Sequence, residues 1–269
     1  MRRWSASARR NGTHLNLAGD LFVAGVSVVA SAINAGAGGG SFLSFPALLA
    51  TGVPPVPANA TNNVAMWLGS FASAGSFRSE IDVPRPALVR ILIASIIGST
   101  IGALLLLRTS NATFGGLIPF LLLVATIVFI AGPALTRITQ KAKTPLTLDS
   151  PLGLVVQTCI AIYGGFFGAA MGILMLALLG VLGVHDLRRA NAFKLVLSTL
   201  INGVAVVPFL LARVIAWEPA AFMSAGAIAG GFLGASMVKR MPPHVIRGFV
   251  TIVACTMTAY FFWADYVRK

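Results

Sequence analysis

Long apolar runs that are almost free of charge dominate this sequence and limit what it can fold into. Of its residues, 57% are hydrophobic and only 10% are charged, whereas about a quarter of a soluble chain is charged. Most of the runs approach the roughly 17–25 residues of a helix that crosses a bilayer. They lie near residues 17–35, 41–51, 58–77, 87–107, 114–135, 152–165, 170–183, 190–212, 218–238 and 245–264. The chain is therefore predicted to be an all-α polytopic membrane protein.

The positive charge of the chain fits a membrane better than nucleic acid. The net charge is +13, but no basic stripe interleaved with aromatic residues is present, so no nucleic-acid partner is expected. In membrane proteins an excess of Lys and Arg belongs to cytoplasmic loops and lipid headgroups. Cys159 and Cys255 lie in apolar runs and the three histidines are scattered. We therefore expect no metal and no cofactor.

Two short motifs recur at a constant offset of 132 residues. G-A-G-G-G at 36–40 falls on G-A-A-M-G at 168–172, and A-N-A at 58–60 falls on A-N-A at 190–192. Self-similarity at a fixed period indicates an internal duplication. The expected organisation is a basic N-terminal tail (1–16), membrane repeat 1 (17–135), a basic inter-repeat loop (136–151), membrane repeat 2 (152–264) and a C-terminal tail (265–269).

The glycine-rich motif of each half interrupts an unusually long apolar stretch. Residues 17–51 and 152–183 are too long for one helical crossing and too short for two. Each glycine disfavours a helix by about 1 kcal/mol relative to alanine, which indicates two half-helices that meet inside the membrane. The alternative is close helix packing through small residues. We therefore predict two homologous halves of about four membrane segments each, the first of each half broken at its glycine-rich motif.

The sequence is compatible with two topologies. If each broken segment crosses the membrane once, both termini and the central basic loop share a side, which satisfies the positive-inside rule. If the broken segments turn back, the two halves are inverted relative to each other, as in many transporters, and the charge bias weakens. Cytoplasmic termini are compatible with both topologies and are expected.

Each half carries a polar face on the helix that follows its glycine-rich motif. In the second half, Asn191, Lys194, Ser198 and Asn202 fall within one sector at 100° per residue, and Lys194 is the one charge clearly inside an apolar run. A buried ammonium usually faces a cavity or a partner. The alternative is that Lys194 reaches the headgroups from near a helix end.

The first half repeats this arrangement. Asn59, Asn62, Ser70 and Ser73 share one helix face, Asn62 occupies the position equivalent to Lys194, and Asn63 lies beside that face. Such residues can also hold membrane helices together by hydrogen bonds. Two equivalent polar faces nevertheless favour one shared site at the interface of the repeats.

The residues around the two motifs indicate an anion as the ligand. Helix N-termini near Ser41 and Ile173 would present backbone N–H groups, Asn and Ser side chains add donors, and no acidic residue lies deep in a membrane segment. No His–Glu, Cys–His or Ser–His–Asp constellation is apparent, so no enzymatic activity is expected. The candidate substrate-binding residues are Gly38, Gly39, Gly40, Ser41, Asn59, Asn62, Asn63, Asn191, Lys194, Ser198 and Asn202.

The motifs also resemble a known family. G-A-G-G-G-S-F-L-S-F-P-A-L-L at 36–49, P-A-N-A-T-N-N-V-A at 57–65 and a degenerate second copy resemble the TauE/SafE family of membrane transporters, over about residues 17–264. The resemblance implies a permease for sulfite, sulfonates or related organosulfur anions. In the second motif, Ala169, Ala170 and Met171 stand where family members often have glycine, which questions the symmetry of the site.

The sequence therefore predicts a secondary transporter for a small anion, bound at the repeat interface. The alternatives are an anion channel-like pore and a membrane scaffold that transports nothing. The expected partners are the solute and the lipid bilayer, and a homodimer is kept as an alternative to a monomer. The expected location is the bacterial inner (cell) membrane.

Overall fold

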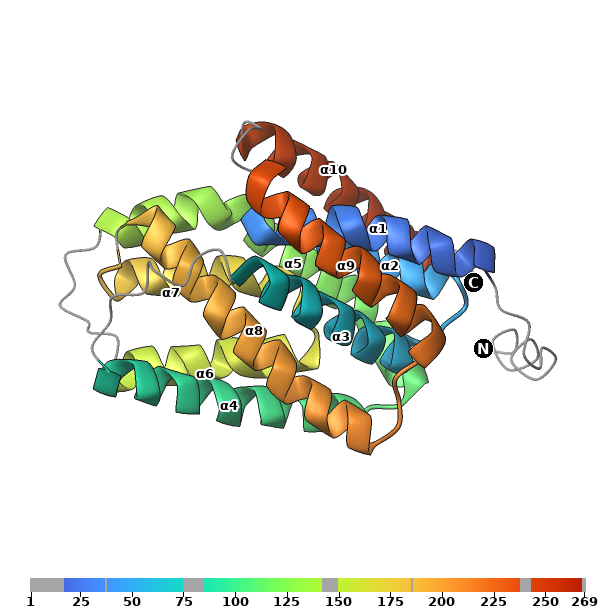
Figure 1. Ribbon diagram of the computed structural model, residues 1–269, viewed down its shortest axis with the longest axis horizontal. Helices are drawn as coiled ribbons and strands as arrows, with labels where there is room; N and C mark the ends of the chain where they lie inside the picture. The colour runs from blue at the N-terminus through green and yellow to red at the C-terminus, as the bar shows by residue number, and fades with distance from the viewer. Residues whose placement is uncertain are drawn as a thin grey trace.

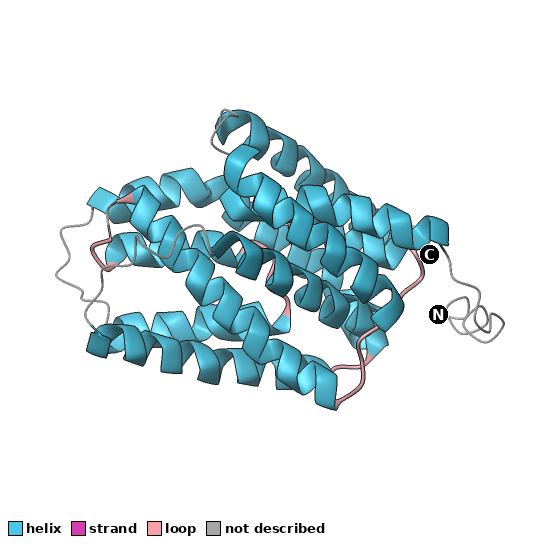
Figure 2. Ribbon diagram, in the orientation of Figure 1, coloured by secondary structure: helices cyan, strands magenta, loops and turns pink. Residues whose placement is uncertain are grey.

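The described part of the chain is helical throughout. The computed structural model describes residues 17–36, 38–74, 85–141, 150–184, 186–237 and 243–267, and its regular elements are all helices (Figures 1 and 2). The all-helical prediction is confirmed. In chain order the elements are α1 (Leu17–Gly36), α2 (Ser41–Ala50), α3 (Pro55–Ala74), α4 (Arg85–Leu107), α5 (Asn111–Lys141), α6 (Pro151–Phe166), α7 (Met171–Val181), α8 (Leu187–Leu211), α9 (Trp217–Met237), α10 (Pro243–Phe262) and the π-helical turn η2 (Trp263–Val267).

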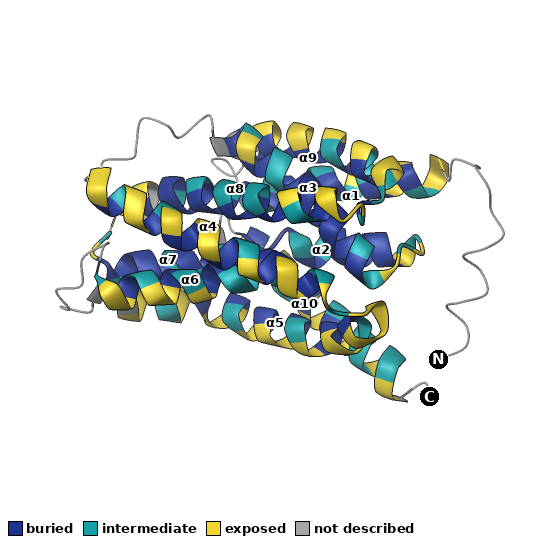
Figure 3. Cartoon of the chain, turned by 90° about the horizontal axis from the view of Figure 1, so that it is seen from below, coloured by how far each residue is buried: buried dark blue, intermediate teal, exposed yellow. Residues whose placement is uncertain are grey.

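Five of the described helices are long and apolar enough to cross a membrane. The spans are Leu17–Gly36, Arg85–Leu107, Asn111–Leu135, Arg189–Leu211 and Val245–Tyr266. Large apolar side chains cover their outer faces: on α5, Val124, Ile127 and Ile130 are each more than half exposed. Figure 3 shows exposed residues on the outer faces of the helices and buried residues where the helices face one another. Such a surface suits lipid, since a soluble protein rarely exposes so large an apolar area.

Several helix boundaries differ from the segments expected from composition. Helix α3 begins at Pro55, before the expected segment 58–77, because proline is well tolerated in the first turn of a helix. Helix α5 continues to Lys141, so the first residues of the expected loop 136–151 are helical. The basic tail 1–16 lies outside the described residues, as does 142–149.

The chain reverses direction between α1 and α2 and again between α6 and α7 (Figure 1). Gly38 and Gly39 have φ angles of +73° and +87°, and Gly168 has a φ of +80°. Glycine adopts this left-handed conformation without steric cost. At the second reversal, a Cβ on Gly153 at the start of α6 would lie 2.9 Å from Leu182, just after α7. Helices α6 and α7 therefore form a hairpin.

Glycines allow helices that are distant in sequence to pack with their backbones in contact. Gly98 and Gly102 of α4 lie against main-chain carbonyl groups of α6, and Gly226 and Gly230 of α9 lie against those of α1. A Cβ at any of these positions would overlap the partner backbone. This close approach through small residues is how membrane helices associate where the hydrophobic effect between them is weak.

The packing role of Gly102 can be tested against a matched glycine. Gly102→Ala should lower the apparent melting temperature in detergent, because overpacking costs about 1–3 kcal/mol. Gly116 lies in α5, and a Cβ added there would have no atom within 4 Å, so Gly116→Ala should leave the melting temperature unchanged or raise it slightly. Equal effects of the two substitutions would contradict this account of the α4–α6 contact.

Candidate functional site

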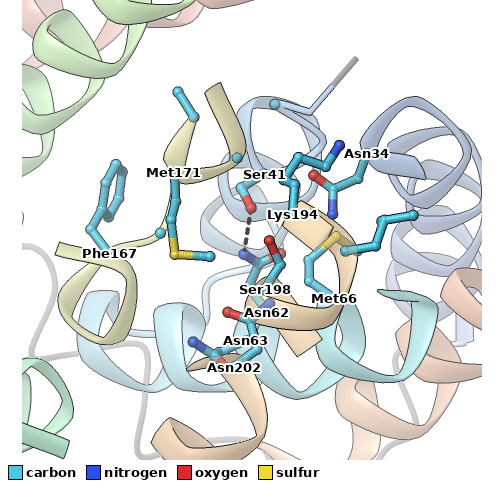
Figure 4. Close-up of a pocket in the computed structure, with 15 residues that line it drawn as sticks. Asn34, Ser41, Asn62, Asn63, Met66, Phe167, Met171, Lys194, Ser198 and Asn202 are labelled. Atoms are coloured by element: carbon cyan, nitrogen blue, oxygen red, sulfur yellow. Dashed lines mark hydrogen bonds between the residues drawn. The ribbon is translucent and has the colours of Figure 1, made fainter. Parts of the chain in front are cut away.

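A cavity lies where both glycine-rich reversals meet the polar faces of α3 and α8. Its volume is about 30 Å³, more than a single water needs. Figure 4 shows the polar side chains that gather around it from the two halves of the chain. The lining residues are Asn34, Gly39, Ser41, Asn62, Asn63, Met66, Phe167, Gly168, Ala170, Met171, Gly172, Lys194, Leu195, Ser198 and Asn202.

Most of the sequence-predicted candidates line this cavity. They are Gly39, Ser41, Asn62, Asn63, Lys194, Ser198 and Asn202. Gly38, Gly40, Asn59 and Asn191 lie around the cavity without lining it. Gly38 faces Ile173, and Gly40 packs against the main chain at Ala30, where a Cβ would overlap the carbonyl group.

Lys194 is the only titratable residue in the lining of the cavity. Its side chain is 2% exposed, and within the described residues its Nζ atom has no hydrogen-bond partner. The aliphatic part of the side chain packs on Gly172, where a Cβ would lie 3.1 Å from Lys194 Cδ. The side chain is therefore buried in the protein along its length. A buried ammonium with no counter-charge costs several kcal/mol, which makes this position a strong attractor for an anion.

Asn62, at the equivalent position of α3, is oriented by a neighbouring hydroxyl group. Ser44 in α2 donates a 2.6 Å hydrogen bond to Asn62 Oδ1, so the amide NH₂ points the other way. That NH₂ makes only a long 3.4 Å contact to Ser41 Oγ, shown dashed in Figure 4. A contact of this length leaves most of its donor capacity free. The cavity therefore receives a donor from Asn62, not an acceptor.

Asn59 and Asn191 hold the ends of helices from the opposite half of the chain. Asn59 Nδ2 donates to the carbonyl oxygen of Phe166, the last residue of α6, at 2.9 Å. Asn191 Nδ2 donates to that of Ala35, near the end of α1, at 3.5 Å. The last carbonyls of a helix lack intrahelical donors, so these side chains satisfy them. Both residues position the reversals that border the cavity.

The helix N-termini contribute differently from what the sequence suggested. Ser41 and Met171, the first residues of α2 and α7, both line the cavity, so the positive ends of these helices face it. The amide of Ile173, however, is not free. It donates to the carbonyl oxygen of Ala170 at 3.0 Å.

Two polar residues of the site escaped the sequence analysis. Asn34 lines the cavity and its Nδ2 lies 3.5 Å from Ser70 Oγ, and Ser44 orients Asn62. Asn34 stands two residues before the first glycine-rich motif, which was a usable signal. Ser44 had none, since its role depends on how α2 packs against α3. In the described ranges, no group of three His, Cys, Asp or Glu side chains is arranged to hold a metal ion.

A polar cavity between the helices of a membrane protein, near reversals of the chain, is the architecture of a helical membrane transporter. The chain belongs to the sulfite exporter TauE/SafE family, whose family model matches residues 23–261. The resemblance seen in the sequence motifs is thereby confirmed. The protein is an integral membrane protein and a membrane transporter of this family.

Curated relatives cover most of the chain. A "Probable membrane transporter protein" of Haemophilus influenzae is 36% identical over 235 residues, which is 87% of this chain and 91% of the relative. The "Probable membrane transporter protein YfcA" of Escherichia coli K12 is 28% identical over 87% of this chain and 86% of the relative. A "Probable membrane transporter protein ORF9" of a Sinorhizobium species is 25% identical over 88% and 89%. No solved structure matches the chain significantly.

Gly39 offers a test of how tightly the first reversal is built. A Cβ at Gly39 would lie 2.8 Å from Phe129 Cε2, whereas Gly52, with a similar φ of +89°, has open space around it. Gly52→Ala should therefore show only the backbone cost of a left-handed alanine, about 1–2 kcal/mol. Gly39→Ala should lower the apparent melting temperature further, because it adds a clash with a buried ring. If both variants lose the same amount, the Phe129 contact does not restrict this loop.

Proposed function

We propose that the protein is a secondary transporter for a small anion, specifically a sulfur-containing anion such as sulfite or an organosulfur anion such as a sulfonate, and that Lys194 is its counter-charge. The observation that carries this proposal is the buried Lys194 ammonium without a partner in the described chain, in a cavity whose lining contains no carboxylate. An ion pair at 4 Å gains about 4 kcal/mol at an effective dielectric constant of 20. The Lys194 ammonium would repel a cation by a similar amount.

The rest of the cavity lining supports an oxyanion. Ser41 and the NH₂ group of Asn62 provide neutral donors, and α2 and α7 direct their positive ends to the same space. Oxyanions with several acceptor oxygens are well matched to donors arriving from several directions. The family description names sulfite export, which supports sulfur chemistry among the anions that such a site would accept.

We further propose that the site lies at the interface of two inverted repeats. Helices α4 and α9 begin at Arg85 and Trp217, and α5 and α10 begin at Asn111 and Pro243, each pair 132 residues apart. The hydroxyl groups of Thr126 and Thr258, separated by the same 132 residues, lie 3.0 Å apart. Contact between equivalent residues is expected at a pseudo-two-fold axis.

The directions of the helices support inversion rather than a parallel repeat. Helix α1 and its counterpart α6 run in opposite directions along the long axis of the molecule (Figure 1). The glycine-rich reversals would then lie within the bilayer, where non-helical backbone is tolerated if it lines a cavity. Alternating access would follow from motion of one set of helices against the other around the fixed site.

Binding of sulfite tests the proposed site. Sulfite should raise the melting temperature of the purified protein with a saturating concentration dependence. Lys194→Met and Asn62→Ala should abolish or reduce that shift, because they remove the counter-charge and the oriented donor. Arg108→Met removes one positive charge from an exposed position outside the cavity and should bind sulfite normally.

The same variants should fail to transport sulfite into proteoliposomes, while Arg108→Met retains transport. Saturation of the rate separates a transporter from a channel-like pore. The site assignment is wrong if Lys194→Met responds to sulfite as the wild type does. Sulfate, taurine and chloride, measured in parallel, would define the substrate class if sulfite itself has no effect.

Cysteine labelling tests the inverted topology. In a Cys159→Ala, Cys255→Ala background, Val53→Cys and Val184→Cys place single thiols after α2 and α7. Inverted repeats put these thiols on opposite sides of the membrane, so a membrane-impermeant maleimide should label each from a different side in inside-out and right-side-out vesicles. Labelling of both from one side would exclude inversion. The start of α1 lies at the same end of the molecule as the end of α2 (Figure 1), and we propose that this end faces the cytoplasm of a bacterial inner membrane.

A further inference from the structure

A proline in α5 leaves one buried carbonyl without its helical donor. Pro133 lies inside α5 and has no N–H, so the carbonyl oxygen of Phe129, four residues earlier, receives no intrahelical hydrogen bond. Arg247 of α10 supplies the missing donor: its Nη2 atom donates to that oxygen at 2.7 Å. An arginine at the start of a different helix thus replaces the donor that Pro133 removes from α5.

The same guanidinium group also contacts the aromatic ring of Phe129. Arg247 Cζ lies 5.0 Å from the ring centroid, within the range of a cation–π interaction. Gly132 makes room for this arrangement, since a Cβ there would lie 3.4 Å from Arg247 Nη2 and 2.7 Å from Ile173. Arg247 therefore holds both the backbone and the ring of a residue that is 0% exposed.

The ring of Phe129 in turn supports the first glycine-rich reversal. A Cβ on Gly39 would lie 2.8 Å from Phe129 Cε2, so the ring is packed directly on the backbone of that glycine. Phe42, in the first turn of α2, meets the same ring edge-to-face with centroids 5.9 Å apart. Gly39 lines the cavity. A chain of contacts thus leads from Arg247 through Phe129 to the backbone of the site.

The second reversal is held in another way. At the 132-residue offset, Arg247 corresponds to Gly115 and Pro133 corresponds to Asp265. Neither the arginine nor the proline is repeated, so this contact has no counterpart at the second reversal. There, the Tyr163 hydroxyl group donates to the carbonyl oxygen of Ala169 at 2.6 Å. Tyr163 belongs to the same hairpin as the reversal that it holds, whereas Arg247 acts on the first reversal from a different helix, α10.

We propose that Arg247 is a positioning residue of the transport site, which holds the Gly39 backbone in place through Phe129 by satisfying the carbonyl that Pro133 leaves free. This inference rests on the proposed function in taking the cavity as the substrate site. Because α10 supplies the arginine and α5 the phenylalanine, a movement of α10 relative to α5 would be transmitted to the backbone of the site.

Restoring the missing helical donor provides the test. Arg247→Met keeps apolar packing but removes the donor, and Pro133→Ala returns an N–H to the Phe129 carbonyl. Backbone amide exchange at residues 38–44, which requires no ligand, should rise about tenfold in Arg247→Met, the size expected from one lost buried hydrogen bond. KM for sulfite transport should rise by a similar factor with a smaller change in kcat. The double variant Pro133→Ala/Arg247→Met should return both quantities to within about twofold of the wild type, and Pro133→Ala alone should change neither.

The outcomes separate this inference from the proposed function. If the double variant behaves like Arg247→Met, or if neither one folds, the restored donor does not replace the arginine and the positioning role is wrong. Restored amide exchange with transport still impaired would also overturn it and would make Arg247 a contact for the anion itself. If exchange follows the expected pattern but the wild type binds none of the anions, the contact is correct and the proposed function fails.

Discussion

The buried ammonium of Lys194 is the constraint on which the rest of the site depends. In an apolar interior an isolated positive charge is too costly to be retained without a compensating environment. The cavity around Lys194 is lined by amides, hydroxyl groups and two helix N-termini, and its lining contains no carboxylate. In the proposed function, this arrangement leaves the charge available for a mobile anion, which a permanent ion pair would not.

Bringing non-helical backbone to this cavity requires glycine at specific places. Gly38, Gly39 and Gly168 adopt left-handed φ angles, and Gly172 leaves space for the stem of Lys194. Each reversal is then tied to the opposite half, because Asn59 and Asn191 satisfy carbonyls at the ends of α6 and α1. The two halves are therefore joined at the site by hydrogen bonds as well as by packing.

The sequence was informative wherever a residue type has a strong local consequence. Apolar length and low charge indicate membrane helices, and the spacing of Asn191, Lys194, Ser198 and Asn202 places them on one helix face. It was less informative where the partner is distant. Asn59 shares a face with Asn62, yet it binds a carbonyl of α6 outside the cavity lining, and no periodicity distinguishes these two roles.

Composition and periodicity were thus sufficient for the fold class and for most of the polar residues around the cavity, and the resemblance of the motifs indicated the family. Hydrophobic periodicity and helix geometry involve only a few neighbouring residues, so a short stretch of sequence is enough to recognise them. The direction of α2 after the first reversal, the orientation of Asn62 by Ser44 and the contact of Arg247 with Phe129 depended on packing between helices far apart in sequence. Such contacts are selected by the shape of the whole bundle, because a donor such as the guanidinium of Arg247 can satisfy only a carbonyl that the fold brings within about 3 Å of it.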